Sequence, residues 1–133
     1  MKNKLLTIGA IVVSILLIVA VIILKQQSSE EDASGLKISQ NVSIVDGTQI
    51  IDIDVRSGYY APRLTYANKD LPTKLRMNSV DSYGCERAFR IPSLNISSEL
   101  PPDGLTEFEL GTPTKSILGT CSMGMYTFLI KFI

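Results

Sequence analysis

The chain has 133 residues, with 13 basic and 13 acidic side chains, two cysteines, four methionines and no histidine. The absence of histidine excludes a Ser-His or Cys-His nucleophile and a blue-copper centre with imidazole ligands. We therefore expect a protein that is not an enzyme, and the balanced charge without a basic patch argues against a nucleic-acid partner.

The first 35 residues predict an accessory segment and a tether. After a flank at residues 1–4, the 20 residues from Leu5 to Leu24 carry no charge and as a helix would span roughly 30 Å, the thickness of a bilayer core. A cleaved signal peptide is the alternative, but its apolar core is usually shorter and ends in small residues. We therefore predict a transmembrane anchor at 5–24, followed by a polar, flexible linker at 25–35.

Lysines flank this segment unevenly. Lys2 and Lys4 precede it and Lys25 follows it, so the positive-inside rule favours, by a small margin, a domain outside the membrane.

Residues 36–133 show the pattern of a β-domain. Short apolar runs alternate with period two between Gly, Pro, Asn and Asp residues, which predicts several strands in a sandwich or barrel. The runs are 49–55, 62–67, 74–80, 105–110 and 126–133, with one helical turn expected at 97–100. The carboxylates Asp52, Asp54, Glu107 and Glu109 alternate along such runs, which is typical of solvated sheet faces.

Four sulfur side chains form a candidate metal site: Cys85, Cys121, Met123 and Met125. Thiolate and thioether ligands are soft and select Cu(I) over Zn²⁺, Mg²⁺ or Ca²⁺. In an extended segment, residues 121, 123 and 125 would project from one face. If Cys121 instead ends a strand and Met125 begins the next, the turn between them can wrap the three sulfurs around one point. Gly124 then permits a tight turn around an ion, and Cys85 comes from a neighbouring turn.

A disulfide between Cys85 and Cys121 is the competing interpretation. It requires an oxidising compartment. Closing the loop of 36 residues (121 − 85) would stabilise the fold by roughly 4 kcal/mol. It does not explain why two methionines lie within four residues of a cysteine.

From about residue 48 to 133 the chain resembles the cupredoxin-like domains of bacterial copper handling. The resemblance is carried by the Cys-Ser-Met-Gly-Met block at 121–125, by its pairing with Gly84-Cys85, and by three weaker features: Gly58-Tyr59-Tyr60-Ala61-Pro62, Ile91-Pro92 and the strand before Gly111. One such domain behind an anchor is similar to the membrane-anchored Cu(I) chaperones of Gram-positive bacteria, which work with a copper-exporting P-type ATPase.

The resemblance implies an all-β, cupredoxin-like Greek-key β-sandwich and two Cu(I) ions per chain. Cys85 and Cys121 would bind the tighter ion, and Met123 and Met125, with a shared cysteine thiolate, the weaker one. It also implies a single-pass protein of the cell membrane whose domain lies on the cytoplasmic face, where free thiols are stable.

Two other functions remain open at this stage. The same residues would serve an extracytoplasmic module that delivers copper to an oxidase, with the topology reversed. A disulfide-linked sandwich without metal would instead be a membrane-tethered interaction domain.

Overall fold

The computed structural model describes residues 12–20 and 37–133. By its contacts the chain divides into two units, Met1–Ala33 and Ser34–Ile133. Residues 12–20 are helical with exposed side chains, and no helix in the described ranges is long and apolar enough to cross a membrane. The rest of the predicted anchor at 5–24 and the linker at 25–35 lie outside the described residues, so both stay predictions.

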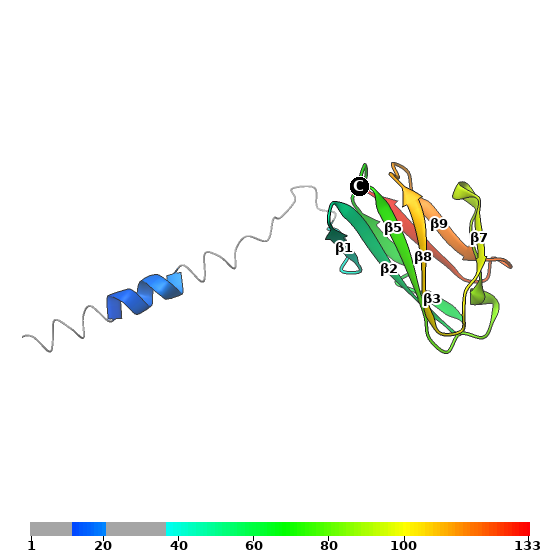
Figure 1. The fold of residues 1–133 in the computed structure, drawn as a ribbon, viewed down its shortest axis with the longest axis horizontal. Coiled ribbons are helices and arrows are strands. Elements are labelled where there is room, and N and C mark those ends of the chain that lie inside the picture. The colour runs from blue at the N-terminus through cyan, green and yellow to red at the C-terminus, as the bar shows by residue number, and fades with distance from the viewer. Residues whose placement is uncertain (1–11, 21–36) are drawn as a thin grey trace, which may run out of the picture. The chain divides into compact units, whose positions relative to one another are not determined.

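The second unit is a sandwich of two mixed β-sheets (Figure 1). One sheet has the order β1-β2-β5-β8, with β3 also paired to β2. Its strands are β1 (Val42–Val45), β2 (Thr48–Arg56), β3 (Tyr59–Ala61), β5 (Thr73–Ser79) and β8 (Gly104–Gly111). β2 and β5 run parallel, and the other pairs in this sheet are antiparallel.

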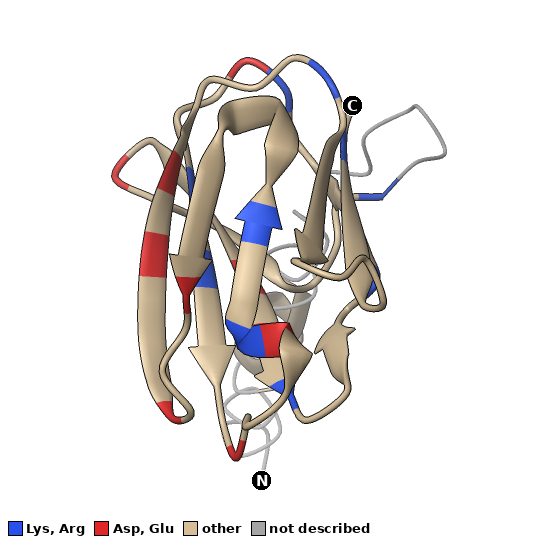
Figure 2. Ribbon diagram, turned by 90° about the vertical axis from the view of Figure 1, so that its right-hand side faces the viewer, with Lys and Arg blue, Asp and Glu red and all other residues tan. Residues whose placement is uncertain are grey.

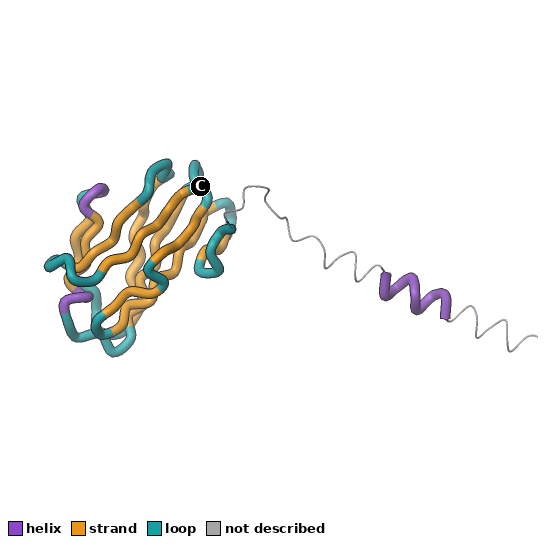
Figure 3. Tube along the Cα trace, turned by 180° about the vertical axis from the view of Figure 1, so that it is seen from behind, coloured by secondary structure: helices purple, strands orange, loops and turns teal. Residues whose placement is uncertain are grey.

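The second sheet has the order β4-β10-β9-β6-β7. Its strands are β4 (Leu64–Ala67), β6 (Ala88–Ile91), β7 (Ile96–Glu99), β9 (Ile117–Cys121) and β10 (Thr127–Phe132). β4 and β10 are parallel, while the hairpin of β9 and β10 is antiparallel. Two short 3₁₀ turns, η1 (Cys85–Arg87) and η2 (Pro92–Leu94), flank β6, and the loops gather at the two ends of the sandwich (Figure 3).

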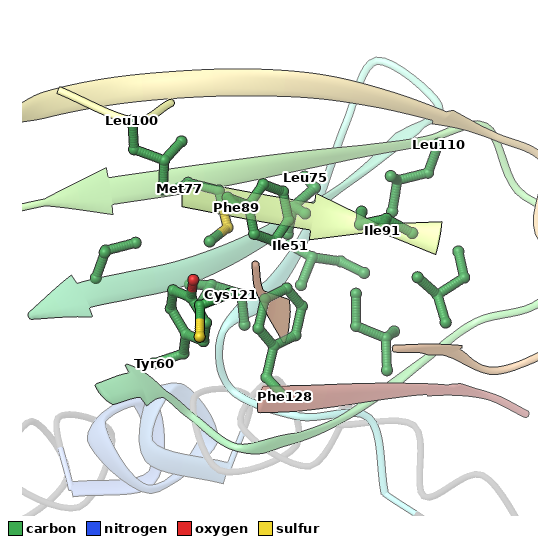
Figure 4. Packing of buried hydrophobic residues seen from close by; sticks show 14 of the residues in the cluster. Ile51, Tyr60, Leu75, Met77, Phe89, Ile91, Leu100, Leu110, Cys121 and Phe128 are labelled. Atoms are coloured by element: carbon green, nitrogen blue, oxygen red, sulfur yellow. The ribbon is translucent and has the colours of Figure 1, made fainter. Parts of the chain in front are cut away.

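The core lies between the sheets because alternate residues of each strand point inward. In β2 the predicted alternation is confirmed, since Ile51, Ile53 and Val55 are fully buried. The rings of Tyr60, Phe89 and Phe128 pack against one another in this core (Figure 4). Tyr60 meets Phe128 edge-on, with ring centroids 5.5 Å apart.

The predicted solvated faces are also confirmed. Asp52 binds Arg76 through two side-chain hydrogen bonds of 2.6 and 2.8 Å, across the parallel pair β2 and β5. Lys74 contacts both Glu107 and Glu109 of β8. Figure 2 marks the acidic and basic positions along the ribbon. The acidic residues of this sheet are thus balanced by cations on its outer face.

The predicted helical turn at 97–100 is wrong. Residues Ile96–Glu99 form β7, which pairs with β6 in antiparallel register. The turn lies earlier, at η2, where Pro92 suits the first position of a helical turn and Asn95 ends it with a positive φ of 54°. β6 supplies a hydrogen-bonding partner that the local sequence does not reveal.

Candidate metal centre

Four loops meet at one end of the sandwich: residues 57–58, 80–87, 100–103 and 122–126. Backbone hydrogen bonds join them, from Ser82 to Pro102, from Leu100 to Arg87 and from Ser122 to Ala88. Strand ends paired in register bring the loops together, because Val55 pairs with Ser79 and Phe89 pairs with Cys121. Both cysteines and both candidate methionines belong to these loops or their margins.

The two cysteines form a close thiol pair. Cys121 is the last residue of β9 and Cys85 begins η1, and their Sγ atoms are 2.8 Å apart. Both are free thiols, so the alternative disulfide is not formed in this structure. Cys121 is 1% exposed and lies beside Tyr60 at the margin of the core, while Cys85 is half-buried (Figure 4).

Hydrogen bonds make the two thiols unequal. Burial raises the pKa of Cys121, but the hydrogen bond from Cys85 and the backbone amides of Tyr126, Met123 and Met125 outweigh it and hold this pKa below its usual value. The pKa of Cys85 is raised, foremost because its thiol donates to Cys121 and then because of burial. Cys121 is therefore the first thiolate of the pair and the better-prepared metal ligand.

The hairpin loop at 122–126 surrounds the Cys121 sulfur with backbone amides. The amide of Cys121 donates to the Tyr126 carbonyl, and that of Gly124 donates to the Cys121 carbonyl. Gly124 has a φ of 72°, a conformation that glycine adopts without strain, and a Cβ there would meet no atom. The predicted turn at Gly124 is confirmed. Glycine suits this position because of its positive φ, since there is room for a side chain.

The expected turn after Cys121 is present and Cys121 ends β9, but the expected start of the next strand at Met125 is wrong. The loop turns at residues 122–126, and β10 begins at Thr127 instead of Met125. Residues 121, 123 and 125 therefore do not share the face of a strand. The reason is that the cysteine amide pairs with Tyr126 and closes the hairpin before Met125 can join the ladder.

Both candidate methionines lie on this loop and outside the core. Their side chains are 73% exposed for Met123 and 62% exposed for Met125, whereas Met77 is fully buried between the sheets. In the described ranges no three His, Cys, Asp or Glu side chains come together as a metal-binding group. What this end offers is two thiols in contact and two thioethers on the adjoining loop, which is a soft donor set suited to Cu(I).

Glu86 is a part of this end that the sequence analysis missed. Its side chain is 1% exposed, and its carboxylate accepts hydrogen bonds from the amides of Gly84 at 2.8 Å and Gly58 at 3.3 Å. Burial raises the pKa of Glu86, but these amides, with those of Glu86 and Tyr83, outweigh burial and lower it. The ionised carboxylate thereby fixes the turn that presents Cys85.

Tyr60 supports the same turn from within the core. Its hydroxyl donates to the Glu86 carbonyl at 2.6 Å. Its pKa is raised, mainly by burial and then by the negative charge of Cys121 and Cys85. Tyr60 thus stays a neutral donor beside the thiols, and of the two tyrosines before Pro62 only this one belongs to the core.

Together these features define a small β-sandwich with a preformed thiol pair at one end. Its fold is shared with a copper-binding protein solved in the apo form by NMR in solution, with a TM-score of 0.63 and 21% identity over 72% of this chain and 98% of that one. It is also shared with the metal-binding domain of the Streptococcus pneumoniae D39 Cu(I)-exporting P-type ATPase CopA, solved with Cu(I). That match has a TM-score of 0.58 and 18% identity over 69% of this chain and 92% of that one.

No family model matches the chain, and no curated protein matches it. At these identities the two solved structures establish a common fold. The chemistry at the end of the sandwich that carries the thiol pair follows from the residues of this chain.

Proposed function

We propose that the chain is a Cu(I)-binding protein of the cupredoxin-like Greek-key class, without catalytic activity, that passes Cu(I) to a copper-exporting P-type ATPase. The observation that carries the proposal is the contact of the Cys85 and Cys121 sulfurs at 2.8 Å, beside a loop with two exposed thioethers. The likeness to an ATPase metal-binding domain that holds Cu(I) supports this context.

The four sulfurs divide naturally into two kinds of ligand. Cys85 and Cys121 are anionic as thiolates and would hold the tighter ion. Met123 and Met125 are neutral and exposed, so an ion that they share with one cysteine thiolate is held more weakly. A weak, open site suits transfer, because a partner's ligands can replace thioethers one at a time.

The proposal also places the domain at the cytoplasmic face of the cell membrane, tethered by the apolar segment from Leu5 to Leu24. Free thiols in contact persist in a reducing compartment and tend to oxidise elsewhere. Cu(I) binding by Cys85 and Cys121 needs both thiols reduced, so the proposed site and the proposed cytoplasmic side go together.

The test is an anaerobic Cu(I) titration of residues 34–133, which contain the whole core and form a unit of their own. Against a Cu(I)-specific competitor dye, we expect two ions per chain with different affinities. Cu(II) should give no intense blue absorption, because the chain has no histidine. A stoichiometry of zero, or a blue Cu(II) adduct, would refute the proposal.

Removing the anchor is expected to reduce copper tolerance even when the domain still binds Cu(I). A flexible linker of the predicted length, about ten residues, would reach on the order of 15–20 Å and would keep the domain near membrane transporters at an effective concentration approaching millimolar. The measurement compares residues 34–133 with the full chain, at matched abundance, in copper-stressed cells that lack the native protein. Full tolerance with the untethered domain would contradict delivery at the membrane.

A further inference from the structure

A small pocket opens directly beside the thioether loop. Its volume is about 140 Å³, and its wall combines residues of β3, the approach to β4 and the start of β10 with the loop itself. The lining residues that matter for its chemistry are Tyr59, Arg63, Met125, Tyr126 and Thr127. The pocket therefore joins one cation, several polar groups and one soft sulfur atom.

Arg63 supplies the charge of this wall. Arg56, Arg76 and Arg87 each contact a carboxylate. Arg63, like Arg90 on β6, is exposed and forms no ion pair with any residue in the described ranges, and of these two only Arg63 lines the pocket. Its backbone is fixed, because its carbonyl accepts a hydrogen bond of 2.8 Å from the Leu129 amide of β10. A guanidinium with free donors is a geometric match for a carboxylate, which it can bind through two parallel hydrogen bonds.

The volume of the pocket and the sulfur of Met125 limit further which kinds of molecule it can bind. Pockets for drug-sized molecules usually measure about 300–1,000 Å³, so this one accommodates a molecule no larger than an amino acid. Met125 lines the pocket and is also a candidate ligand of the weaker Cu(I) site. Because Arg63 and Met125 line the same small pocket, a molecule that fills it can contact both.

We propose that this pocket seats the carboxylate of an amino-acid-sized thiol, whose sulfur coordinates the Cu(I) held by Met123, Met125 and the shared cysteine thiolate. This inference rests on the proposed Cu(I) site. On binding, a Cu–S bond forms, the thiol proton passes to solvent and copper stays in the +1 state, so no electron acceptor is needed. The pocket thus gives small copper–thiol complexes a docking point from which Cu(I) exchanges between thiol and protein.

The first experiment tests the pocket without copper. Reduced, metal-free residues 34–133 are titrated with 3-mercaptopropionate and with 2-mercaptoethanol, a thiol of similar size without a carboxylate, and followed by the backbone amide signals in NMR. We expect saturable shifts of the amide signals of Gly58, Tyr126 and Thr127 with 3-mercaptopropionate and none with 2-mercaptoethanol. Arg63→Gln should weaken this binding at least fivefold, and Lys131→Gln, which removes an exposed charge further along β10, should not.

The second experiment repeats the titration on the Cu(I)-loaded domain. We expect 3-mercaptopropionate to bind at least tenfold more tightly than in the first experiment and at least fivefold more tightly than 2-mercaptoethanol, with that preference lost in Arg63→Gln. Propionate, which lacks sulfur, should gain nothing from copper. Equal binding of the two thiols, or an equal gain for propionate, overturns the inference.

The two failures are distinguishable. If the domain takes up no Cu(I), the proposed function fails and the copper-dependent part of this inference fails with it. If Cu(I) binds but the metal-free domain shows no preference for the carboxylate, the pocket assignment alone is wrong.

Discussion

Cys121→Ser is expected to abolish the tight Cu(I) site and to weaken the second site at least tenfold. Cys121 is the thiol with the lowered pKa, and backbone amides from three residues of the hairpin loop surround its sulfur. It adjoins both Cys85 and the methionine loop, so its thiolate is the one that we expect the two ions to share. Serine keeps the size and the hydrogen bond but offers a hard oxygen in place of a soft sulfur.

The methionines should behave differently. The double variant Met123→Leu, Met125→Leu keeps the apolar volume and removes both thioethers, so we expect loss of the weak ion and retention of the tight one. Because both side chains are largely exposed, stability should change by less than about 1 kcal/mol. Met77→Leu is the matched control, since it removes a fully buried thioether and should leave both ions in place.

Competition titrations against a Cu(I) dye measure both affinities for each variant, and urea unfolding checks that each variant is folded. If the double methionine variant still binds two ions with unchanged affinities, the division of roles is wrong. If Cys121→Ser keeps its tight ion, the thiol pair is not the primary site.

The sequence predicts a strand best where apolar and polar residues alternate strictly along it. In β2, Ile51, Ile53 and Val55 alternate with polar residues, and the register follows directly from that pattern. β9 was not predicted as a complete strand because one of its inward positions is Gly119, which carries no side chain and so interrupts the apolar pattern. The gap is filled from the opposite strand, where the ring of Phe128 lies over Gly119 and would collide with any side chain there.

The candidate site was predictable in its chemistry and less so in its geometry. The spacing of Cys121, Met123 and Met125 identified a soft donor set, and Gly124 identified a turn. The hairpin closure at Tyr126 depends on the ladder between β9 and β10, and that pairing cannot be read from the five residues themselves. The contact of Cys85 with Cys121 likewise depends on the register of β6 against β9.

Glu86 was beyond prediction for a different reason. A glutamate between cysteine and arginine in a polar stretch is normally a surface residue, and composition gives no sign that it is buried. Its burial is possible because four backbone amides converge on the carboxylate, and those amides come from the turn at Gly58 as well as from its own loop. Only the assembled fold brings these donors together.

Glu86→Gln is accordingly expected to destabilise the metal-free domain by about 2–3 kcal/mol at neutral pH. The substitution preserves shape but replaces an accepting oxygen with an NH₂ group that faces backbone N–H donors, which leaves buried donors unsatisfied. It should also loosen the η1 turn and weaken Cu(I) binding at Cys85. Glu99→Gln is the matched control: this residue is largely exposed in its pair with Arg87, so its loss should cost no more than about 0.5 kcal/mol.

The pH dependence of the domain's stability tests independently whether the Glu86 carboxylate is ionised. The pKa of Glu86 is lower in the folded domain than its ordinary value near 4.3, so its stabilising contribution is complete above that value and is lost as the pH falls through the folded-state pKa. Urea unfolding of the chelator-treated domain between pH 7 and pH 3 should show wild type losing more stability on acidification than Glu86→Gln, so that the two converge at low pH. Parallel curves for the two proteins would mean that Glu86 is not held ionised by the amides around it, and the structural account of the Cys85 turn would have to be abandoned.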